Sequence, residues 1–410
     1  MLMLAIKNAR LFDGTGRLPE GPATVLIERD TVTKVGPSAE IEIPAGFDTI
    51  DALGMFLMPG LVDAHVHITG SGEPNILKRM KELIPHAAIR SAQNAKATLE
   101  AGFTAVRDAG AGFLVDVALK QAINEGLVPG PRLQVAGKGL SITGGHGDTR
   151  NGWPPEVEFK GRAVVDSPDE ARRAAREQLR DGADHIKLHA TGGVMSEGDV
   201  PTARGLTIEE MRAAIEEAHN VGKKAMAHAQ GSLGIKNAIL AGVSSIEHGF
   251  YLTDEIIELM LKRDVFLVPT LVAVHQIVVN GTKAGIPEYG VRKAIEAHEA
   301  HIASFKKAYA AGVKIAMGTD ASTPFNYHGK NALELELMVN AGMKPVDAIL
   351  AATRMGAELM GWGDRTGQVK PGFWADMILV DGDPIEDIRV LQDSSKIKLV
   401  MKGGQVVLRR

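Results

Sequence analysis

The middle of the chain alternates between short apolar segments and helix-like stretches rich in Ala, Glu, Arg and Lys. The apolar segments have the length and composition of buried strands, and the stretches between them carry apolar residues at helical spacing. One such stretch, "SPDEARRAAREQLRDG", begins with Ser167 as a candidate N-cap, and another reads "TIEEMRAAIEEAHNVG". The candidate strands cover residues 57–68, 103–108, 132–136, 185–190, 224–229, 244–249, 265–271 and 314–319.

This alternation predicts an α/β fold in which helices cover a parallel sheet. Eight strand–helix units favour a TIM-type (β/α)8 barrel, and a doubly wound open sheet is the alternative. No G-x-G-x-x-G or Walker sequence opens a predicted helix, so the sequence does not support a nucleotide site. Residues 1–56 and 368–410 carry short β-branched segments broken by Gly, Asp and Pro. We expect these two ends to pair as one small sheet domain beside a barrel of residues 57–367.

The composition excludes several classes of protein. The 410 residues carry a formal net charge of −4 without a basic block, so neither nucleic acid nor an anionic membrane is an expected partner. The absence of cysteine excludes disulfides and thiolate metal sites and is compatible with the cytoplasm, the expected location. No stretch approaches the roughly 20 apolar residues of a membrane-spanning helix. A small-molecule or dipeptide substrate is the expected partner, and a homo-oligomer is compatible with the sequence.

Polar side chains gather where the predicted strands end. In a barrel, the carboxyl ends of the strands form the face that carries the chemistry. The residues concerned are His65 and His67 on the first strand, Lys187 on the fourth, His228 on the fifth, His248 on the sixth and Asp320 on the eighth. We therefore expect these six side chains to meet at one end of the barrel.

Their chemistry favours a metal site. Residues i and i+2 of a strand point the same way, so His65 and His67 can converge on one ion. Imidazole and carboxylate ligands suit Zn²⁺, and also Mn²⁺, Co²⁺, Ni²⁺ or Fe²⁺. Lys187 is unexpected there, because an ammonium group would repel divalent ions and burial disfavours its charge. A neutral Lys187 amine could instead react with CO₂ to give a carbamate, an anion able to bridge two metals.

Together these motifs resemble those of the amidohydrolase superfamily over essentially the whole chain. The motifs are "PGLVDAHVH", "HIKLHATGG", "MAHAQG", "IEHGF", "MGTDAS" and "GQVKPGFWADMILVDGDP". The resemblance implies a distorted TIM barrel with a binuclear metal centre and a β-sandwich built from both chain ends. It also implies that His65, His67 and Asp320 hold the more buried ion, that carboxylated Lys187 bridges both ions, and that His228 and His248 hold the more exposed one.

Within the superfamily, the chain looks most like the metal-dependent dipeptidase and carboxypeptidase branch. That branch includes Xaa-Pro dipeptidases, arginine or lysine carboxypeptidases and N-acyl amino acid hydrolases, and imidazolonepropionases are related to it. In some relatives a tyrosine two positions after the fifth-strand histidine contacts the substrate carboxylate. The equivalent position here is Gln230, which leaves the side-chain preference open. Arg150 and Arg204 could hold a carboxylate, although surface solubility is the favoured explanation for both.

The resulting hypothesis is hydrolysis of a peptide or other amide bond by a hydroxide that bridges two metals. Asp320 would take the proton from the water and pass it to the leaving amine. His146, in the glycine-rich segment "SITGGHGD", would contact the substrate and donate a hydrogen bond to the developing oxyanion. Gln230 and His328 are further candidate substrate contacts. The alternatives are an imidazolonepropionase-like cyclic amide hydrolase or deaminase, and a non-catalytic scaffold with the same fold.

Overall fold

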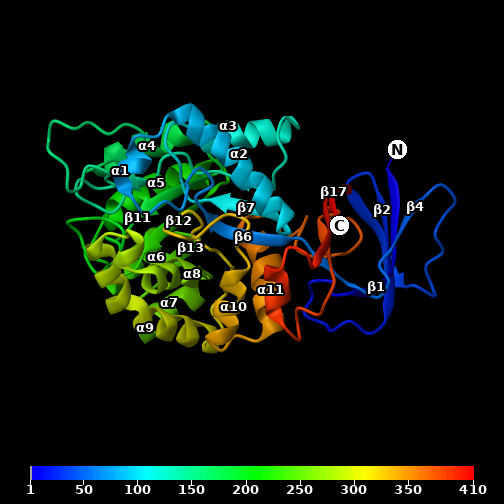
Figure 1. The fold of residues 1–410 in the computed structure, drawn as a ribbon. Helices are drawn as coiled ribbons and strands as arrows, with labels where there is room; N and C mark the ends of the chain where they lie inside the picture. Colours follow the sequence, from blue (N-terminus) through cyan, green and yellow to red (C-terminus); the bar gives the residue numbers. More distant parts are fainter. Residues whose placement is uncertain (1) are drawn as a thin grey trace.

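The computed structural model describes residues 2–410 and shows a barrel-like body with a smaller sheet attached to one side (Figure 1). The strands of the body are parallel and form two sheets. The first sheet has the order β6 (Leu61–Val66), β7 (Phe103–Asp108) and β8 (Arg132–Gln134). The second has the order β10 (Ala163–Val164), β9 (Leu140–Ser141), β11 (His185–His189), β12 (Lys224–Ala229), β13 (Ser245–His248) and β14 (Phe266–Val268).

Irregular backbone joins the two sheets on both sides and gives the body the TIM-barrel-like form that the sequence predicts. Residues 314–321 run between β14 and β6 in place of a regular eighth strand. They exchange backbone hydrogen bonds with both neighbours, so the order of the ring is kept. The joining bonds include those from Leu267 N to Lys314 O, from Ala64 N to Met317 O and, on the opposite side, from Asp184 N to Val135 O.

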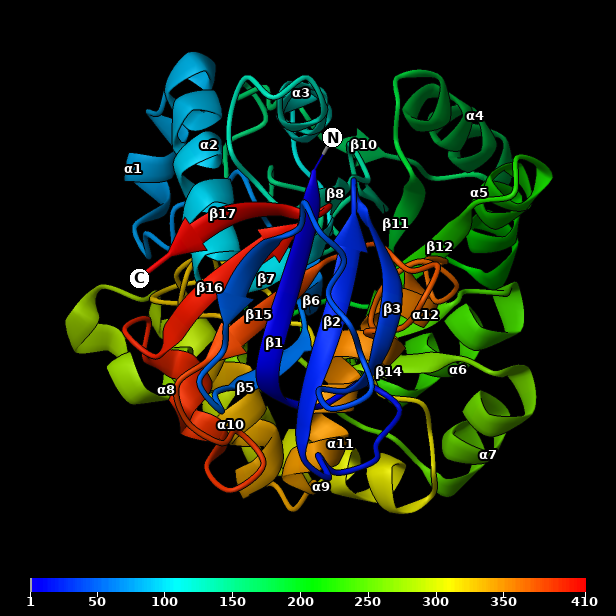
Figure 2. The same cartoon turned by 90° about the vertical axis from the view of Figure 1, so that its right-hand side faces the viewer.

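Helices surround these strands (Figure 2). The two helix-like sequences singled out above are confirmed as α4 and α5. The Ser167 side chain caps α4 by accepting a hydrogen bond from Glu170 N, and Thr207 forms a capping box with Glu210 at the start of α5. The α-helices are α1 (Ile76–Met80), α2 (Ile84–Glu100), α3 (Val115–Asn124), α4 (Pro168–Arg180), α5 (Ile208–Asn220), α6 (Ser232–Ala241), α7 (Asp254–Arg263), α8 (Leu271–Asn280), α9 (Glu288–Ala310), α10 (Leu333–Asn340), α11 (Pro345–Leu350) and α12 (Gly356–Leu359), with shorter helical segments at Thr282–Ala284, Ala351–Met355 and Ile388–Gln392.

Strands from both ends of the chain pair in one eight-stranded sheet, in the order β17-β16-β15-β5-β1-β2-β3 with β4 beside β1. The stretch predicted as one strand, residues 57–68, is in fact two strands separated at Gly60, and the first of them belongs to this sheet. A side chain at Gly60 would collide with Thr104, because a Cβ atom would lie 2.1 Å from Thr104 Oγ1. The strands are β1 (Met3–Leu11), β2 (Pro22–Glu28), β3 (Thr31–Pro37), β4 (Asp48–Asp51), β5 (Phe56–Pro59), β15 (Met377–Val380), β16 (Ile397–Lys402) and β17 (Gln405–Arg409).

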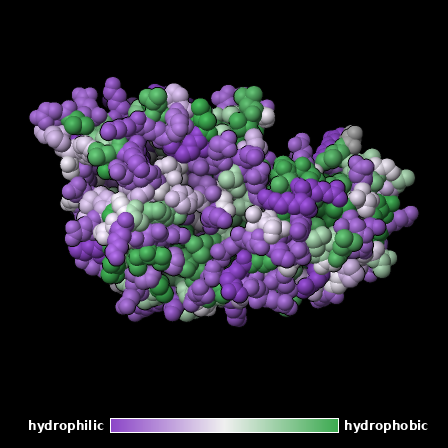
Figure 3. All heavy atoms as spheres, viewed as in Figure 1, coloured by the Kyte–Doolittle hydropathy of each residue, from purple (hydrophilic) through white to green (hydrophobic). Residues whose placement is uncertain are grey.

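Each part of the molecule has its own apolar core. In the terminal sheet, side chains from the N-terminal strands, such as Ile6 and Val25, pack with Met377 and Leu399 from the C-terminal strands. In the body, a larger core fills the space between the strands and the helices, and it extends to the terminal sheet through residues such as Phe56 and Val400. Figure 3 shows hydrophilic side chains over most of this face of the body, with apolar ones scattered among them. In residues 2–410 no helix has both the length and the apolar character needed to cross a bilayer.

Asp63 holds the barrel together where residues 314–321 meet β6. Its carboxylate is fully buried and accepts four hydrogen bonds. They come from His65 N (3.1 Å), Thr319 N (3.1 Å), Thr319 Oγ1 (2.6 Å) and Asn331 Nδ2 (2.8 Å). One side chain therefore fixes the backbone of His65 and the segment that leads to Asp320.

Replacing Asp63 by Ala should destabilise the protein strongly. Each buried donor that loses its partner costs about 1–3 kcal/mol, so we expect a loss of about 3 kcal/mol or more. Urea unfolding followed by circular dichroism measures this loss. Asp48→Ala is the matched control, because Asp48 is exposed, and it should change stability by less than about 0.5 kcal/mol. An equal effect of the two substitutions would contradict this role of Asp63.

Candidate metal centre

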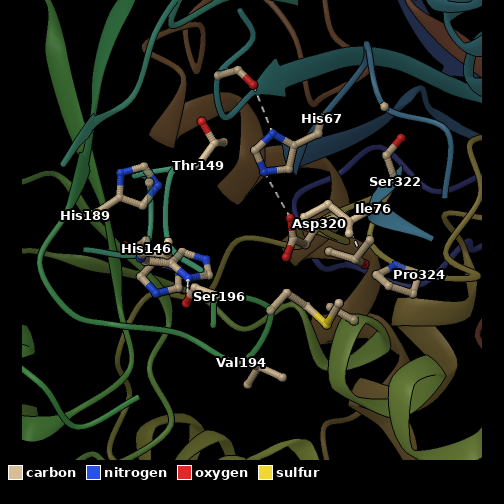
Figure 4. A pocket seen from close by; sticks show the side chains of 18 of the residues that line it. His67, Ile76, His146, Thr149, His189, Val194, Ser196, Asp320, Ser322 and Pro324 are labelled. Carbon is tan, nitrogen blue, oxygen red and sulfur yellow. Dashed lines mark hydrogen bonds and ion pairs between the residues drawn. The ribbon is translucent and has the colours of Figure 1, made fainter. Parts of the chain in front are cut away.

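A cavity of about 530 Å³ opens at the carboxyl ends of the body strands. Figure 4 shows His67 and Asp320 on one side of this cavity, with His146 and His189 on the other. The structure brings together every metal ligand that the sequence predicts. The cavity is lined by His65, His67, Lys187, His228, His248 and Asp320, and also by His146 and Gln230.

His65 is oriented by a buried carboxylate. Its Nδ1 atom lies 2.7 Å from Glu247 Oε2, and Glu247 in turn accepts a bond from Arg107 at 3.0 Å. Burial would raise the pKa of Glu247, but Arg107 and His65 outweigh burial and lower it. An ionised Glu247 must accept a hydrogen bond from Nδ1–H, which leaves the lone pair of His65 on Nε2. That buried Nε2 atom has no hydrogen-bond partner among residues 2–410, as expected of a ring nitrogen that binds a metal.

The surroundings of His65 favour positive charge. Burial and Lys187 lower its pKa, but Asp320 and Glu247 outweigh them and raise it. Donor atoms of His65, His248 and Asp320 all lie within 4.8 Å of one another, so the ligands expected for the two ions meet in the same part of the cavity. Asp320 Oδ1 also lies 3.3 Å from His67 Nε2, while His67 Nδ1 lies 3.1 Å from the Gly110 carbonyl oxygen. These residues therefore fit a divalent cation.

His248 and His228 each offer one free ring nitrogen. Thr270 Oγ1 donates to the Pro269 carbonyl and accepts from His248 Nδ1 at 2.7 Å, so His248 presents Nε2 as a ligand. His228 is arranged in the opposite way. Its Nε2 atom donates to the Gly192 carbonyl at 2.9 Å, which leaves Nδ1 available.

The predicted ligands His248 and Asp320, and Thr270 which holds His248, have left-handed backbone conformations that side chains disfavour. The φ angles are 74° for His248, 53° for Thr270 and 56° for Asp320. Such conformations cost about 1–3 kcal/mol each and are typical of functional sites. Two of the three residues are predicted ligands, and the third holds one of them.

Lys187 is buried on β11, only 2% exposed. Burial lowers the pKa of its amine to about 8, so the neutral amine is accessible near neutral pH. Within residues 2–410, the Lys187 amine forms no hydrogen bond or ion pair with another side chain. Lys187 thus fits the chemistry that carbamate formation requires.

His146 differs in detail from the predicted donor. Ser196 Oγ donates to Asp199 Oδ1 at 2.5 Å, so it must accept from His146 Nδ1, which lies 2.7 Å away. The neutral ring therefore carries its lone pair on Nε2 and can accept a hydrogen bond there. Donation to an oxyanion would require the imidazolium form, which burial disfavours by lowering the pKa of His146 to about 4.

The other predicted substrate contacts divide into two groups. Gln230 lines the cavity, is 4% exposed, and has an Oε1 atom without a partner among residues 2–410. His328 instead lies behind His67, because its Nε2 atom bonds the His67 carbonyl and its Nδ1 atom bonds Thr98. It is outside the cavity lining, so in place of a substrate contact the structure gives it a role in holding the His67 backbone.

Several residues of the site were not predicted from the sequence. Arg107 bonds Glu247 across the barrel, and its neighbour Asp108 accepts from backbone N–H groups. The signal for Glu247 was a charged residue inside the apolar strand "SSIEHGF". The two arginines that line the cavity are Arg79 and Arg162, whereas Arg150 and Arg204 lie outside the lining.

Comparison with known proteins finds relatives that match most of this chain. Ochratoxinase of Aspergillus niger is 35% identical over 369 residues, which cover 85% of this chain and 75% of the relative. The crystal structure of a Xaa-Pro dipeptidase with methionine bound in its active site matches with a TM-score of 0.92 and 35% identity, and covers 99% of this chain and 100% of that one. A prolidase complexed with N-methylphosphonate-L-proline also matches with a TM-score of 0.92, at 31% identity, and covers 100% of both chains.

The family comparison is equally extensive. Residues 56–407 match the model of the Amidohydrolase family, which spans the whole barrel and part of the terminal sheet. The matched segment contains every residue of the candidate metal centre. The chain therefore belongs to the amidohydrolase family.

Proposed function

We propose that the protein is a binuclear metal-dependent hydrolase that cleaves the amide bond of a dipeptide or an N-acyl amino acid. Membership of the amidohydrolase family makes it a hydrolase of amide bonds. The finer proposal is supported by the convergence of all predicted ligands on one cavity, with metal-facing nitrogens left free by bonds on the opposite side of the rings.

The residues that would hold the ions follow from the donor set. His65, His67 and Asp320 would bind one ion, His228 and His248 the other, and carboxylated Lys187 would connect them. When bound, such ions lower the pKa of water enough to make a nucleophile and polarise the scissile carbonyl. The mixture of imidazole and carboxylate suits Zn²⁺ best and admits Mn²⁺, Co²⁺, Ni²⁺ or Fe²⁺.

Asp320 and His146 have complementary properties for amide hydrolysis. Burial would raise the pKa of Asp320, but hydrogen bonds and charge from His65 and His67 hold it well below the usual range. Asp320 is therefore ionised and can take a proton from water and deliver it to the leaving amine. His146, through Nε2, can accept a hydrogen bond from a substrate N–H group and so orient the amide.

The wall of the cavity suits an amino acid with an apolar side chain. Val194, Phe250, Val274 and Ile277 belong to one apolar cluster and line the cavity beside the polar residues. The similar dipeptidase and prolidase structures hold methionine and a phosphonate analogue containing proline. These ligands support amino acid derivatives as the substrate class of this chain.

The first test loads the purified protein with Zn²⁺, Mn²⁺ or Co²⁺ in bicarbonate and measures metal content by elemental analysis. We expect a pair of ions per chain and hydrolysis of Xaa-Pro, Xaa-Arg, Xaa-Lys or N-acyl amino acid substrates, with the activity lost after chelation. A single ion with ring opening or ammonia release alone would favour the cyclic amide hydrolase or deaminase alternative and reject the proposal.

Lys187→Ala should lower both metal content and kcat/KM. Removing a residue that only hydrogen-bonds a metal ligand typically lowers metal affinity or activity by about 10–100-fold. The loss in Lys187→Ala should be larger, because the proposed bridging ligand itself is removed. Lys224→Ala is the matched control, since Lys224 begins β12 at the opposite end of the barrel. Full occupancy and unchanged kcat/KM in Lys187→Ala would rule out the bridge.

Glu247→Gln should weaken metal binding by about 10–100-fold, because the amide no longer fixes the His65 tautomer as a carboxylate does. Competition with a chromogenic chelator measures the affinity. Glu258→Gln, an exposed change on α7, should leave the affinity at the wild-type value. If both variants bind metal equally well, Glu247 does not orient the ligand.

A further inference from the structure

Two arginines line the cavity. Arg79 is on the short helix α1, Arg162 directly precedes β10, and both line the cavity. Among residues 2–410, no side-chain hydrogen bond or ion pair joins either guanidinium to another residue. Each side chain is exposed to solvent inside the cavity, although surrounding protein desolvates it enough to lower its pKa.

Among residues 2–410, no nearby acidic residue forms an ion pair with either arginine, although the charge of Glu73 partly offsets the effect of burial on the pKa of Arg79. Glu73, the acidic group closest in sequence to Arg79, pairs with Lys78 at 3.2 Å. Asp148 accepts hydrogen bonds from the Gly144 and Arg150 backbone. Glu197 also lines the cavity, but it forms no ion pair with either arginine. Two guanidinium groups therefore remain available to an anion that enters the cavity.

The two arginines also interact electrostatically with each other. The charge of Arg79 adds to burial in lowering the pKa of Arg162, so the two groups lie near enough to repel each other. Mutual repulsion of unpaired cations in a partly desolvated cavity is relieved when an anion binds between them.

We propose that Arg79 and Arg162 form the binding site for the free carboxylate of the substrate. The inference rests on the proposed amide hydrolysis and narrows its substrate class. The substrate is an N-acyl amino acid or dipeptide whose free carboxylate lies between the guanidiniums while its apolar side chain contacts the cluster of Val194, Val274 and Ile277. The planar guanidinium fork matches a carboxylate, which a lysine cannot reproduce.

Gln230 also lines the cavity, but its side chain is neutral and buried. The positive charge that the cavity does provide comes from α1 and from the segment before β10. The carboxylate is therefore held by residues outside the strand ends that carry the metal ligands.

The test compares a substrate with its uncharged analogue. N-acetyl-L-phenylalanine and N-acetyl-L-phenylalaninamide differ only in the charge of the terminal group. Their binding to the Zn²⁺-loaded protein is measured by titration calorimetry, and the hydrolysis of matched dipeptides and dipeptide amides gives kcat/KM. The variants are Arg79→Met, Arg162→Met, the double variant and Arg162→Lys, with Arg204→Met as the control outside the cavity lining.

We expect each methionine variant to lower the preference for the carboxylate over the amide by about 10–100-fold, through KM rather than kcat. Arg162→Lys should keep part of the carboxylate preference that Arg162→Met loses. The control Arg204→Met should keep the full preference. Metal content and the thermal midpoint should stay at wild-type values in every variant. Unchanged carboxylate preference in the double variant would overturn the proposal, even if the wild type hydrolyses amides.

The calorimetry separates this proposal from the proposed function. If the wild type cleaves no amide but still binds N-acetyl-L-phenylalanine in a manner that depends on both arginines, the carboxylate site stands and the amide hydrolysis falls. If it cleaves amides with equal preference for charged and uncharged termini, hydrolysis stands and the arginine site falls.

Discussion

Asp63 and Glu247 are buried carboxylates without access to water, so protein donors must satisfy them. The Asp63 carboxylate accepts hydrogen bonds from Thr319 and Asn331, which fixes both residues against β6. The Glu247 carboxylate accepts hydrogen bonds from Arg107 and His65, which connects these two residues across the barrel. Both sets of hydrogen bonds therefore fix β6, which carries Asp63 and His65. The position of the metal-facing side chains is a consequence, because His65 and Asp320 cannot move unless a buried charge loses its partners.

The same demand explains why the closing segment is irregular. A regular strand at residues 314–321 would alternate its side chains, whereas Asp63 needs both the N–H and the hydroxyl of Thr319. The chain then turns into a left-handed conformation at Asp320, with φ of 56°, and directs that carboxylate toward His65 and His67. The strained backbone is thus held by hydrogen bonds to a group that is itself fixed.

The sequence predicts the barrel-like fold and the gathering of the candidate ligands in one cavity, because both depend on local patterns. The pair His65–His67 and the single residues at other strand ends need only the strand periodicity and the barrel rule. Glu247 and Thr270 are harder, since their importance lies in contacts with residues distant in sequence. Arg79 and Arg162 are harder still, because a short helix and a loop position them and no periodic pattern marks either one.

The predicted and the unpredicted residues lie on different sides of the cavity. The strand ends and buried carboxylates fix the metal side of the cavity to a geometry that tolerates little change. The opposite side is built from α1, the segment before β10 and α8, which pack on the barrel without being part of its ring. Substitutions there alter the charge and shape that the substrate meets while Asp63 and Glu247 keep the ligands in place. The residues that we propose to select the substrate are therefore mechanically separate from those that we propose to hold the metals.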